Sequence, residues 1–239
     1  MQDDDGRVVE ERYLDANGYP VARYENFHGL SYEYDETSTV ITYLDVEGNP
    51  IIRSDGYSTI VRTQVDGRAY DDFFYDLNGQ QVQCSGGYYG LRRGYNAEGQ
   101  NISLAFLDKD GRAVCTLSGY AIMTYQRDMN GTVVGKQYFD TDGNPVRSSL
   151  GKYGEFYQRN EQGYTGQITY LDADGNPAPT NAGYTILKCT YHRDGTTDTD
   201  MYFDANGNPK ALSKRQYGIK RSGRANILLD RNGNVMPCV

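Results

Sequence analysis

A segment of about 32 residues recurs along the whole chain, and this repeat limits the possible folds more than any other feature. Its marker is an aromatic residue or leucine, any residue, an aspartate, two further residues and a glycine. Successive marker aspartates are separated by 30, 31, 32, 32, 32, 32 and 26 residues. They are Asp15, Asp45, Asp76, Asp108, Asp140, Asp172, Asp204 and Asp230. Residues 1–239 are therefore predicted to form a single repeat domain of about eight units, the first incomplete and the last shortened as a cap.

Each marker predicts a turn that ends a strand. In Asp172–Gly175 the aspartate caps its own turn, and the glycine takes the positive φ that follows a type I turn with a bulge. A weaker marker lies between the first ones: Gly-Tyr, a run of several residues, and an Asp/Asn-Gly turn, as in GYTILKCTYHRDG. In that run Leu187, Cys189 and Tyr191 alternate with their neighbours, as residues of a strand do.

Each unit is thus predicted to be a strand, a tight turn, a second strand, a D-x-x-G turn and a polar connection. A lone hairpin is marginal in water, so neighbouring units have to bury one another's side chains. The predicted fold class is all-β, with tandem β-hairpin repeats forming either an elongated antiparallel sheet or a β-solenoid.

The amino-acid composition excludes several classes of binding partner. Hydrophobic residues make up only 38% of the chain, and 23 tyrosines stand against seven phenylalanines and no tryptophan, so tyrosine rings must supply much of the buried area. The net charge of −8 argues against a nucleic-acid partner or an anionic membrane, because both require a basic surface. No run of 18 apolar residues is present, so no direct membrane insertion is expected.

Segments such as YFDTDGNPV and FYDLNGQQV resemble the tyrosine-rich repeats of bacterial surface proteins. These are the YD repeats of the rearrangement-hot-spot family and the cell-wall or glucan-binding repeats related to choline-binding modules. The chain departs from the second group in having no tryptophan and a longer period. The resemblance implies a secreted or cell-surface bacterial repeat without catalytic activity, with carbohydrate or cell-wall binding as the expected role.

The tyrosines are the candidate ligand-binding residues. One tyrosine of the weaker marker recurs in each unit, and such a row either holds unit to unit or stacks against a ligand. The leading hypothesis is a module that binds a glycan or a protein partner along an extended aromatic face. The candidate residues are Tyr57, Tyr88, Tyr120, Tyr153, Tyr184 and Tyr217. The alternatives are a spacer that displays another domain of a larger protein and a calcium-stabilised repeat.

Other constellations give little support to catalysis or to a cofactor, and we expect neither. Weak calcium candidates are Asp140, Asp142, Asp172 and Asp174, but other copies carry asparagine at the second position, which suits a turn better than a metal. Cys189 lies three residues from His192, a spacing that places two strand residues on opposite faces.

The cysteines are too few and too scattered for a disulfide framework. Cys84 and Cys115 fall at nearly matching places in neighbouring units. A bridge between them and a pair of buried free thiols are therefore both open, with free thiols favoured.

Overall fold

The structure is a computed structural model that describes residues 1–23, 26–212, 215–223 and 225–237. The chain divides into two compact units, Met1–Leu117 and Ser118–Val239, and each is described by itself. The prediction of a single repeat domain concerns the whole chain and stays a prediction.

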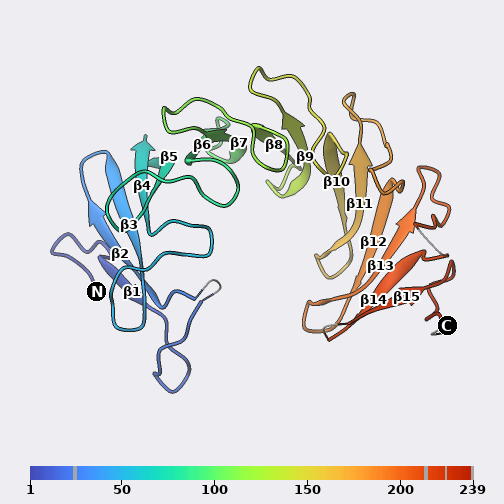
Figure 1. The fold of residues 1–239 in the computed structure, drawn as a ribbon, viewed down its shortest axis with the longest axis horizontal. Coiled ribbons are helices and arrows are strands. Elements are labelled where there is room, and N and C mark those ends of the chain that lie inside the picture. The colour runs from blue at the N-terminus through green and yellow to red at the C-terminus, as the bar shows by residue number, and fades with distance from the viewer. Residues whose placement is uncertain (24–25, 213–214, 224, 238–239) are drawn as a thin grey trace. The chain divides into compact units, whose positions relative to one another are not determined.

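Every regular element among the described residues is a β-strand, and each strand pairs antiparallel with the next strand in its unit (Figure 1). Unit 1 contains β1 (Glu10–Arg12), β2 (Gly29–Tyr34), β3 (Ser38–Leu44), β4 (Thr59–Val65), β5 (Arg68–Tyr75), β6 (Gly90–Tyr95) and β7 (Asn101–Leu107). Unit 2 contains β8 (Ile122–Arg127), β9 (Val133–Phe139), β10 (Gly154–Arg159), β11 (Thr165–Leu171), β12 (Ile186–Tyr191), β13 (Thr197–Phe203), β14 (Gly218–Ser222) and β15 (Ala225–Leu229). The all-β prediction of tandem hairpins is confirmed, and each unit takes the open-sheet alternative.

The D-x-x-G turns have the predicted geometry. In the turn after β9, Asp140 Oδ1 accepts the backbone N–H groups of Asp142 at 2.9 Å and Asn144 at 2.8 Å, and Gly143 has φ +82°. Pro145 pairs with Phe139 in an isolated bridge rather than within a strand, which its missing N–H permits. The aspartate and the glycine therefore close the turn together.

The polar connection predicted between repeats is an ordered third turn of the same kind. In the regular middle of the chain, glycines with positive φ recur after 12, 8 and 12 residues, at Gly99, Gly111, Gly119 and Gly131. The glycine at the end of the 8-residue interval, such as Gly119, belongs to this third turn. Sequence inspection missed it because its first position is not an aspartate but varies, as Cys84, Thr116, Ser148 and Thr180 show.

Among the described residues, four pairs of consecutive third turns are each joined by a backbone hydrogen bond. We call this series the turn column. In unit 1, Ser85 N donates to Asp55 O at 2.8 Å and Leu117 N donates to Gly86 O at 3.0 Å. In unit 2, Ser149 N donates to Ser118 O at 2.8 Å and Asn181 N donates to Leu150 O at 3.2 Å.

Where successive hairpins pair, one strand position carries a glycine in some repeats and a larger residue in the repeats between them. Gly29, Gly90, Gly154 and Gly218 face the larger residues Arg12, Phe73, Gln137 and Met201 on the preceding strand. At the equivalent position of intervening repeats, Thr59 faces Thr42 and Ile186 faces Thr169. A large residue opposite glycine, or two of medium size, fills similar space across the pair.

The core of unit 1 lies between the sheet and the segments that lead to the third turns. Ile41 and Ile60 come from the strands, Cys84 from a third turn, and Tyr43, Tyr57 and Phe74 from the strand ends and the turn exits. Aromatic rings therefore supply half of the buried residues of this core.

Candidate functional site

Aromatic rings from successive repeats interlock in a zigzag that we call the aromatic ladder. One set of rings follows the third turns, and the other precedes the D-x-x-G turns. In unit 1 the ring centroids of successive members lie 4.4–6.0 Å apart, as in Tyr57–Phe74 at 4.4 Å. Its members in unit 1 are Tyr13, Phe27, Tyr43, Tyr57, Phe74, Tyr88 and Phe106; those in unit 2 are Tyr120, Tyr138, Tyr170, Tyr184 and Tyr202.

Four of the six candidate tyrosines belong to this ladder: Tyr57, Tyr88, Tyr120 and Tyr184. The prediction of one common row is wrong for Tyr153 and Tyr217. Tyr153 N donates to Leu171 O and the Tyr153 carbonyl accepts from Tyr138 N. Ser58 makes the same two bonds, with Tyr75 O and Tyr43 N. Tyr153 therefore stands one residue after the ladder position, where an extended chain points its side chain to the opposite face.

Tyr217 is displaced in the same way, because its N–H donates to Leu229 O and its carbonyl accepts from Tyr202 N. Gln216 occupies the ladder position there, and Lys152 occupies it in the repeat of Tyr153. The Lys152 ammonium lies 4.9 Å from the centroid of the Tyr170 ring, so a cation–π contact replaces the ring contact in that repeat.

The ladder is largely interior. Tyr57 is buried, and Tyr88, Tyr120 and Tyr184 are half-buried. Burial raises the pKa of Tyr57, of Tyr120 and of Tyr184 above the ordinary value for a phenol. The rings hold repeat to repeat and leave parts of the half-buried members at the surface.

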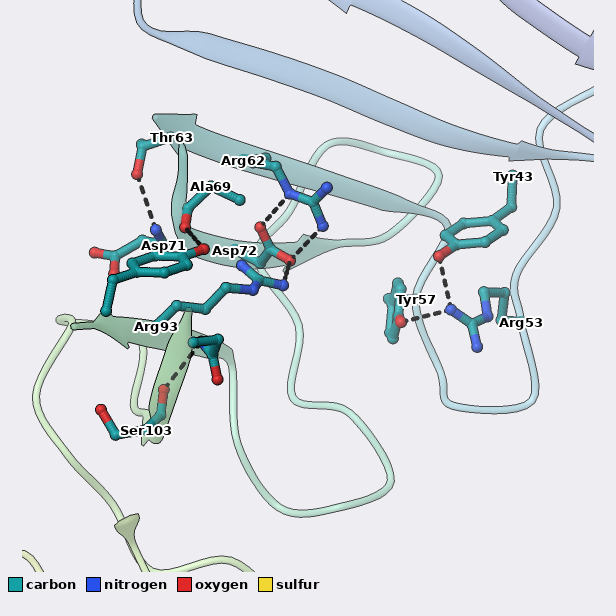
Figure 2. A network of polar contacts seen from close by, with 12 residues as sticks. Tyr43, Arg53, Tyr57, Arg62, Thr63, Ala69, Asp71, Asp72, Arg93 and Ser103 are labelled. Carbon is teal, nitrogen blue, oxygen red and sulfur yellow. Dashed lines mark hydrogen bonds and ion pairs between the residues drawn. The ribbon is translucent and has the colours of Figure 1, made fainter. Parts of the chain in front are cut away.

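A buried carboxylate links two neighbouring repeats in unit 1 (Figure 2). Asp72 lies on β5 with only 3% of its side chain exposed. It accepts two hydrogen bonds of 2.8 Å from Arg62 on β4 and one of 2.7 Å from Arg93 on β6. Burial alone would raise the pKa of Asp72, but the two guanidinium groups outweigh it and hold the pKa below its usual value. We call Arg62, Asp72 and Arg93 the charged triad.

Sequence inspection missed the charged triad among 24 basic and 32 acidic residues. A signal was present four residues before the marker aspartates, where apolar Ile41, Leu104 and Ile168 alternate with charged Glu11, Asp72, Lys136 and Asp200. Charged residues that alternate with apolar ones at a single repeat position indicate paired charges beside the core.

Beside the charged triad lies a pocket of about 360 Å³, which we call the triad pocket. Two consecutive third turns and the ladder residues Tyr57, Phe74 and Tyr88 line it. The wall residue Tyr57 is held in place by Arg53, which donates hydrogen bonds of 2.7 Å to both Tyr43 Oη and Tyr57 Oη (Figure 2). The pocket thus combines aromatic walls with fixed hydrogen-bonding groups.

An equivalent pocket of about 170 Å³ lies in unit 2, between the third turns that contain Leu150 and Ala182. Lys152, Tyr170 and Tyr184 line it at the positions that Tyr57, Phe74 and Tyr88 hold in the triad pocket. The repeat therefore builds the same kind of hollow in each unit, with a different lining.

The calcium candidates are engaged in their turns. Asp140 and Asp172 each direct Oδ1 to two backbone N–H groups, at 2.8–3.0 Å. Asp142 and Asp174 are exposed at the neighbouring turn position. Within the described ranges no group of three or more His, Cys, Asp or Glu side chains is placed to hold a metal ion.

His192 and Cys189 do not form a nucleophile–base pair in this structure. His192 begins the turn after β12, and its Nε2 lies 3.5 Å from Asp198 Oδ1. Burial, and then a hydrogen bond to the Asp200 carboxylate, raise the pKa of the Cys189 thiol to about 12. Since the thiolate is the reactive form, Cys189 is a poor nucleophile at neutral pH.

Cys84 and Cys115 are free, so a bridge between them is not formed, and Cys238 lies outside the described residues. Cys84 is buried, whereas Cys115 is exposed, contrary to the expectation that both are buried. We expect a maleimide to modify Cys115 rapidly in the folded protein and Cys84 only after unfolding. Peptide mass spectrometry after timed labelling measures both rates. Equal rates in the native protein would contradict the burial of Cys84.

The fold and the pockets define the class: an all-β tandem hairpin repeat protein stabilised by interlocked tyrosine rings. Comparison with protein-family models and with curated proteins finds no match to this sequence. Within the part of the chain that the structure describes, no helix has the length and apolar character needed to cross a membrane.

Proposed function

We propose that this protein is a non-catalytic repeat module that binds a glycan in the pockets between successive repeats. The observation that carries the proposal is the recurrence of equivalent pockets with ladder residues in their walls. A bacterial cell-surface or extracellular setting belongs to the same proposal and rests on the resemblance of YFDTDGNPV and FYDLNGQQV to surface repeats.

The chemistry of the pockets suits sugar rings. A sugar offers an apolar ring face together with hydroxyl groups, and a half-buried tyrosine offers an apolar ring with a polar edge. One repeat contributes two strands, so equivalent positions in one sheet recur at about 10 Å, twice the spacing between neighbouring strands. A polymer with a repeating unit can therefore present the same group to successive repeats, which raises the overall affinity through multivalency.

The test is binding of the purified chain to an array of bacterial and host polysaccharides, followed by titration calorimetry with each glycan that is retained. We expect Tyr184→Ala to weaken binding about tenfold, corresponding to a loss of about 1.4 kcal/mol. The expected cause is loss of the ring from the wall of the unit 2 pocket.

Tyr153→Ala is the matched control, because it removes a tyrosine beside the ladder rather than in it. Circular dichroism and a melting curve establish that both variants remain folded. A Tyr153→Ala variant as impaired as Tyr184→Ala would refute a ladder-based site.

A protein partner is the second candidate, and exposed leucines in the turn column favour it. Leu117 and Leu150 are 78% and 64% exposed. Exposed apolar side chains on a repeated surface are typical of protein contacts. Loss of a pulled-down partner on Leu150→Ser, with glycan binding absent from the wild-type chain, would support this candidate. A chain that retains neither glycan nor partner would favour the spacer hypothesis.

A further inference from the structure

The triad pocket differs from its unit 2 equivalent in having a charged floor. Asp55, Arg62, Asp72 and Arg93 all line it. In the next unit, Tyr157, Ile168 and Cys189 stand at the positions of Arg62, Asp72 and Arg93, by their offsets from the turns. The triad pocket is therefore the one of the two that is lined by both carboxylate and guanidinium groups.

One of those groups lacks a partner. Arg93 Nη1 is buried and has no hydrogen-bond partner within the described part of the chain, although Nη2 of the same guanidinium is held by Asp72 at 2.7 Å. A buried N–H donor without an acceptor is costly, and a ligand oxygen would remove that cost. The unpaired nitrogen therefore indicates an oxygen-bearing ligand.

Acceptors stand at the rim of the same pocket. The Asp55 side chain is 40% exposed and accepts a hydrogen bond of 3.3 Å from Ser85 Oγ, across two consecutive third turns. A ligand hydroxyl at this point has a carboxylate to donate to and a serine hydroxyl beside it. The lining residues therefore include an unpaired donor on Arg93 and acceptors on Asp55 and Ser85.

A glycine in the pocket wall allows the close approach of a tyrosine ring. The position before the closing residue of the third turn carries a side chain in other repeats, as Asp55, Ser118, Leu150 and Ala182 show, but it is Gly86 here. A Cβ at Gly86 would clash with Cε1 of Tyr88 and lie 3.1 Å from Cδ1. Glycine at this position therefore lets the Tyr88 ring pack against the third turn in the wall of the pocket.

The charges of the pocket are balanced. Its lining carries two guanidinium and two carboxylate groups, and both Arg62 and Arg93 already bind Asp72. The pKa of Arg62 is raised, chiefly by its hydrogen bonds to Asp72, so the pair remains charged and mutually neutralised. This balance favours an uncharged ligand over an anionic one.

From these observations we infer that the triad pocket binds one neutral pyranose residue. Its ring face packs on Tyr88, an oxygen accepts from Arg93 Nη1, and a hydroxyl donates to Asp55. The pocket volume of about 360 Å³ lies within the range of small-ligand sites. The inference rests on the proposed glycan-binding function and names one site and one ligand chemistry for it.

The experiment compares Gly86→Leu with Ser118→Leu, which places the same side chain at the equivalent position of a third turn outside both pockets. The ligands are tetrasaccharides of glucose, galactose, mannose, N-acetylglucosamine and glucuronic acid, titrated into the full chain. We expect at least one neutral tetrasaccharide to bind. Gly86→Leu should weaken it at least tenfold, and Ser118→Leu should leave its affinity within twofold.

Arg93→Lys is a second variant, because it retains the charge next to Asp72 but removes the fork that supplies Nη1. We expect it to lose affinity for the same sugar while its melting transition stays cooperative. Binding that is lost on Tyr184→Ala and kept on Gly86→Leu would overturn the inference and leave the proposed function intact. Binding of the glucuronic acid tetrasaccharide alone would overturn the neutral ligand. A wild-type chain that binds no saccharide here or on the array would refute both proposals.

Discussion

Replacing Asp72 by alanine is expected to lower the free energy of unfolding by about 3 kcal/mol, the largest stability effect of any single change considered for this protein. The substitution leaves Arg62 and Arg93 without their shared carboxylate, while Asp72 itself is only 3% exposed. An uncompensated buried charge costs far more than a broken surface pair. Equilibrium unfolding in urea, followed by circular dichroism, measures the difference.

Asp71→Ala is the matched control on the same strand. Asp71 also binds an arginine in bidentate fashion, with Arg92 at 2.8 and 2.7 Å, but the Arg92 side chain is 39% exposed. Solvent screens that pair, so a loss of at most about 1 kcal/mol is expected. Equal losses in the two variants would contradict the special role of the charged triad.

Replacing the whole triad gives a complementary test. The equivalent positions in unit 2 carry Tyr157, Ile168 and Cys189. The triple variant Arg62→Tyr, Asp72→Ile and Arg93→Cys therefore introduces a set of side chains that the same fold already accommodates. Buried ion pairs are often replaced by apolar groups at little cost. The triple variant should therefore be more stable than Asp72→Ala alone, and a less stable triple variant would count against this account.

The same carboxylate makes stability depend on pH. The pKa of Asp72 is lower in the folded protein than the value of about 3.9 for an unfolded aspartate. Its contribution is therefore fully present above about pH 4 and is lost as the pH falls through the folded pKa. The stability difference between wild type and Asp72→Ala should shrink on acidification in that window.

Gly154→Ala is expected to destabilise the protein by about 1–3 kcal/mol, the range for inserting an atom into a packed site. A Cβ at Gly154 would lie 2.6 Å from Lys136 O and 3.2 Å from Gln137 Cγ on β9. The backbone oxygen cannot move without disturbing the pairing of β9 with β10. A thermal unfolding curve, with chemical denaturation beside it, measures the loss.

Gly166→Ala in the adjacent strand β11 is the control. A Cβ there would lie 3.3 Å from Asn160 Cβ, and Gly166 does not have a positive φ. Its expected effect is within about 1 kcal/mol, because any crowding is offset by the reduced entropy of the unfolded chain. If Gly154→Ala proved neutral or stabilising, the close approach of β9 and β10 would not be the reason for glycine at this position.

Much of the fold could be predicted because the turns are local. Asp140 and Gly143 lie within four residues, and the conformation they require depends on few neighbours, so the D-x-x-G turns and the strands between them were evident from spacing alone. The third turn escaped prediction because its first position carries no shared residue. Only its closing glycine, such as Gly119, marked it.

The candidate site was predicted less completely, and Tyr153 shows why. A shift of one residue moves a side chain to the other face of an extended chain. Tyr153 lies two residues after Gly151, and Lys152 lies between them at the ladder position. In a sequence this rich in tyrosine, that shift of one residue is easily overlooked. The register of pairing, which is a non-local property, decides which tyrosine enters the ladder.

The sequence by itself determined the repeat length, the all-β class and the position of each D-x-x-G turn, because turn geometry depends on residues close together in the chain. The tertiary structure alone decided that the connections form a hydrogen-bonded turn column, that Asp72 joins Arg62 and Arg93, and that Gly86 packs against the Tyr88 ring in a pocket wall. These features unite residues up to about 30 positions apart. Their contacts depend on how one repeat packs on the next, which no single repeat contains.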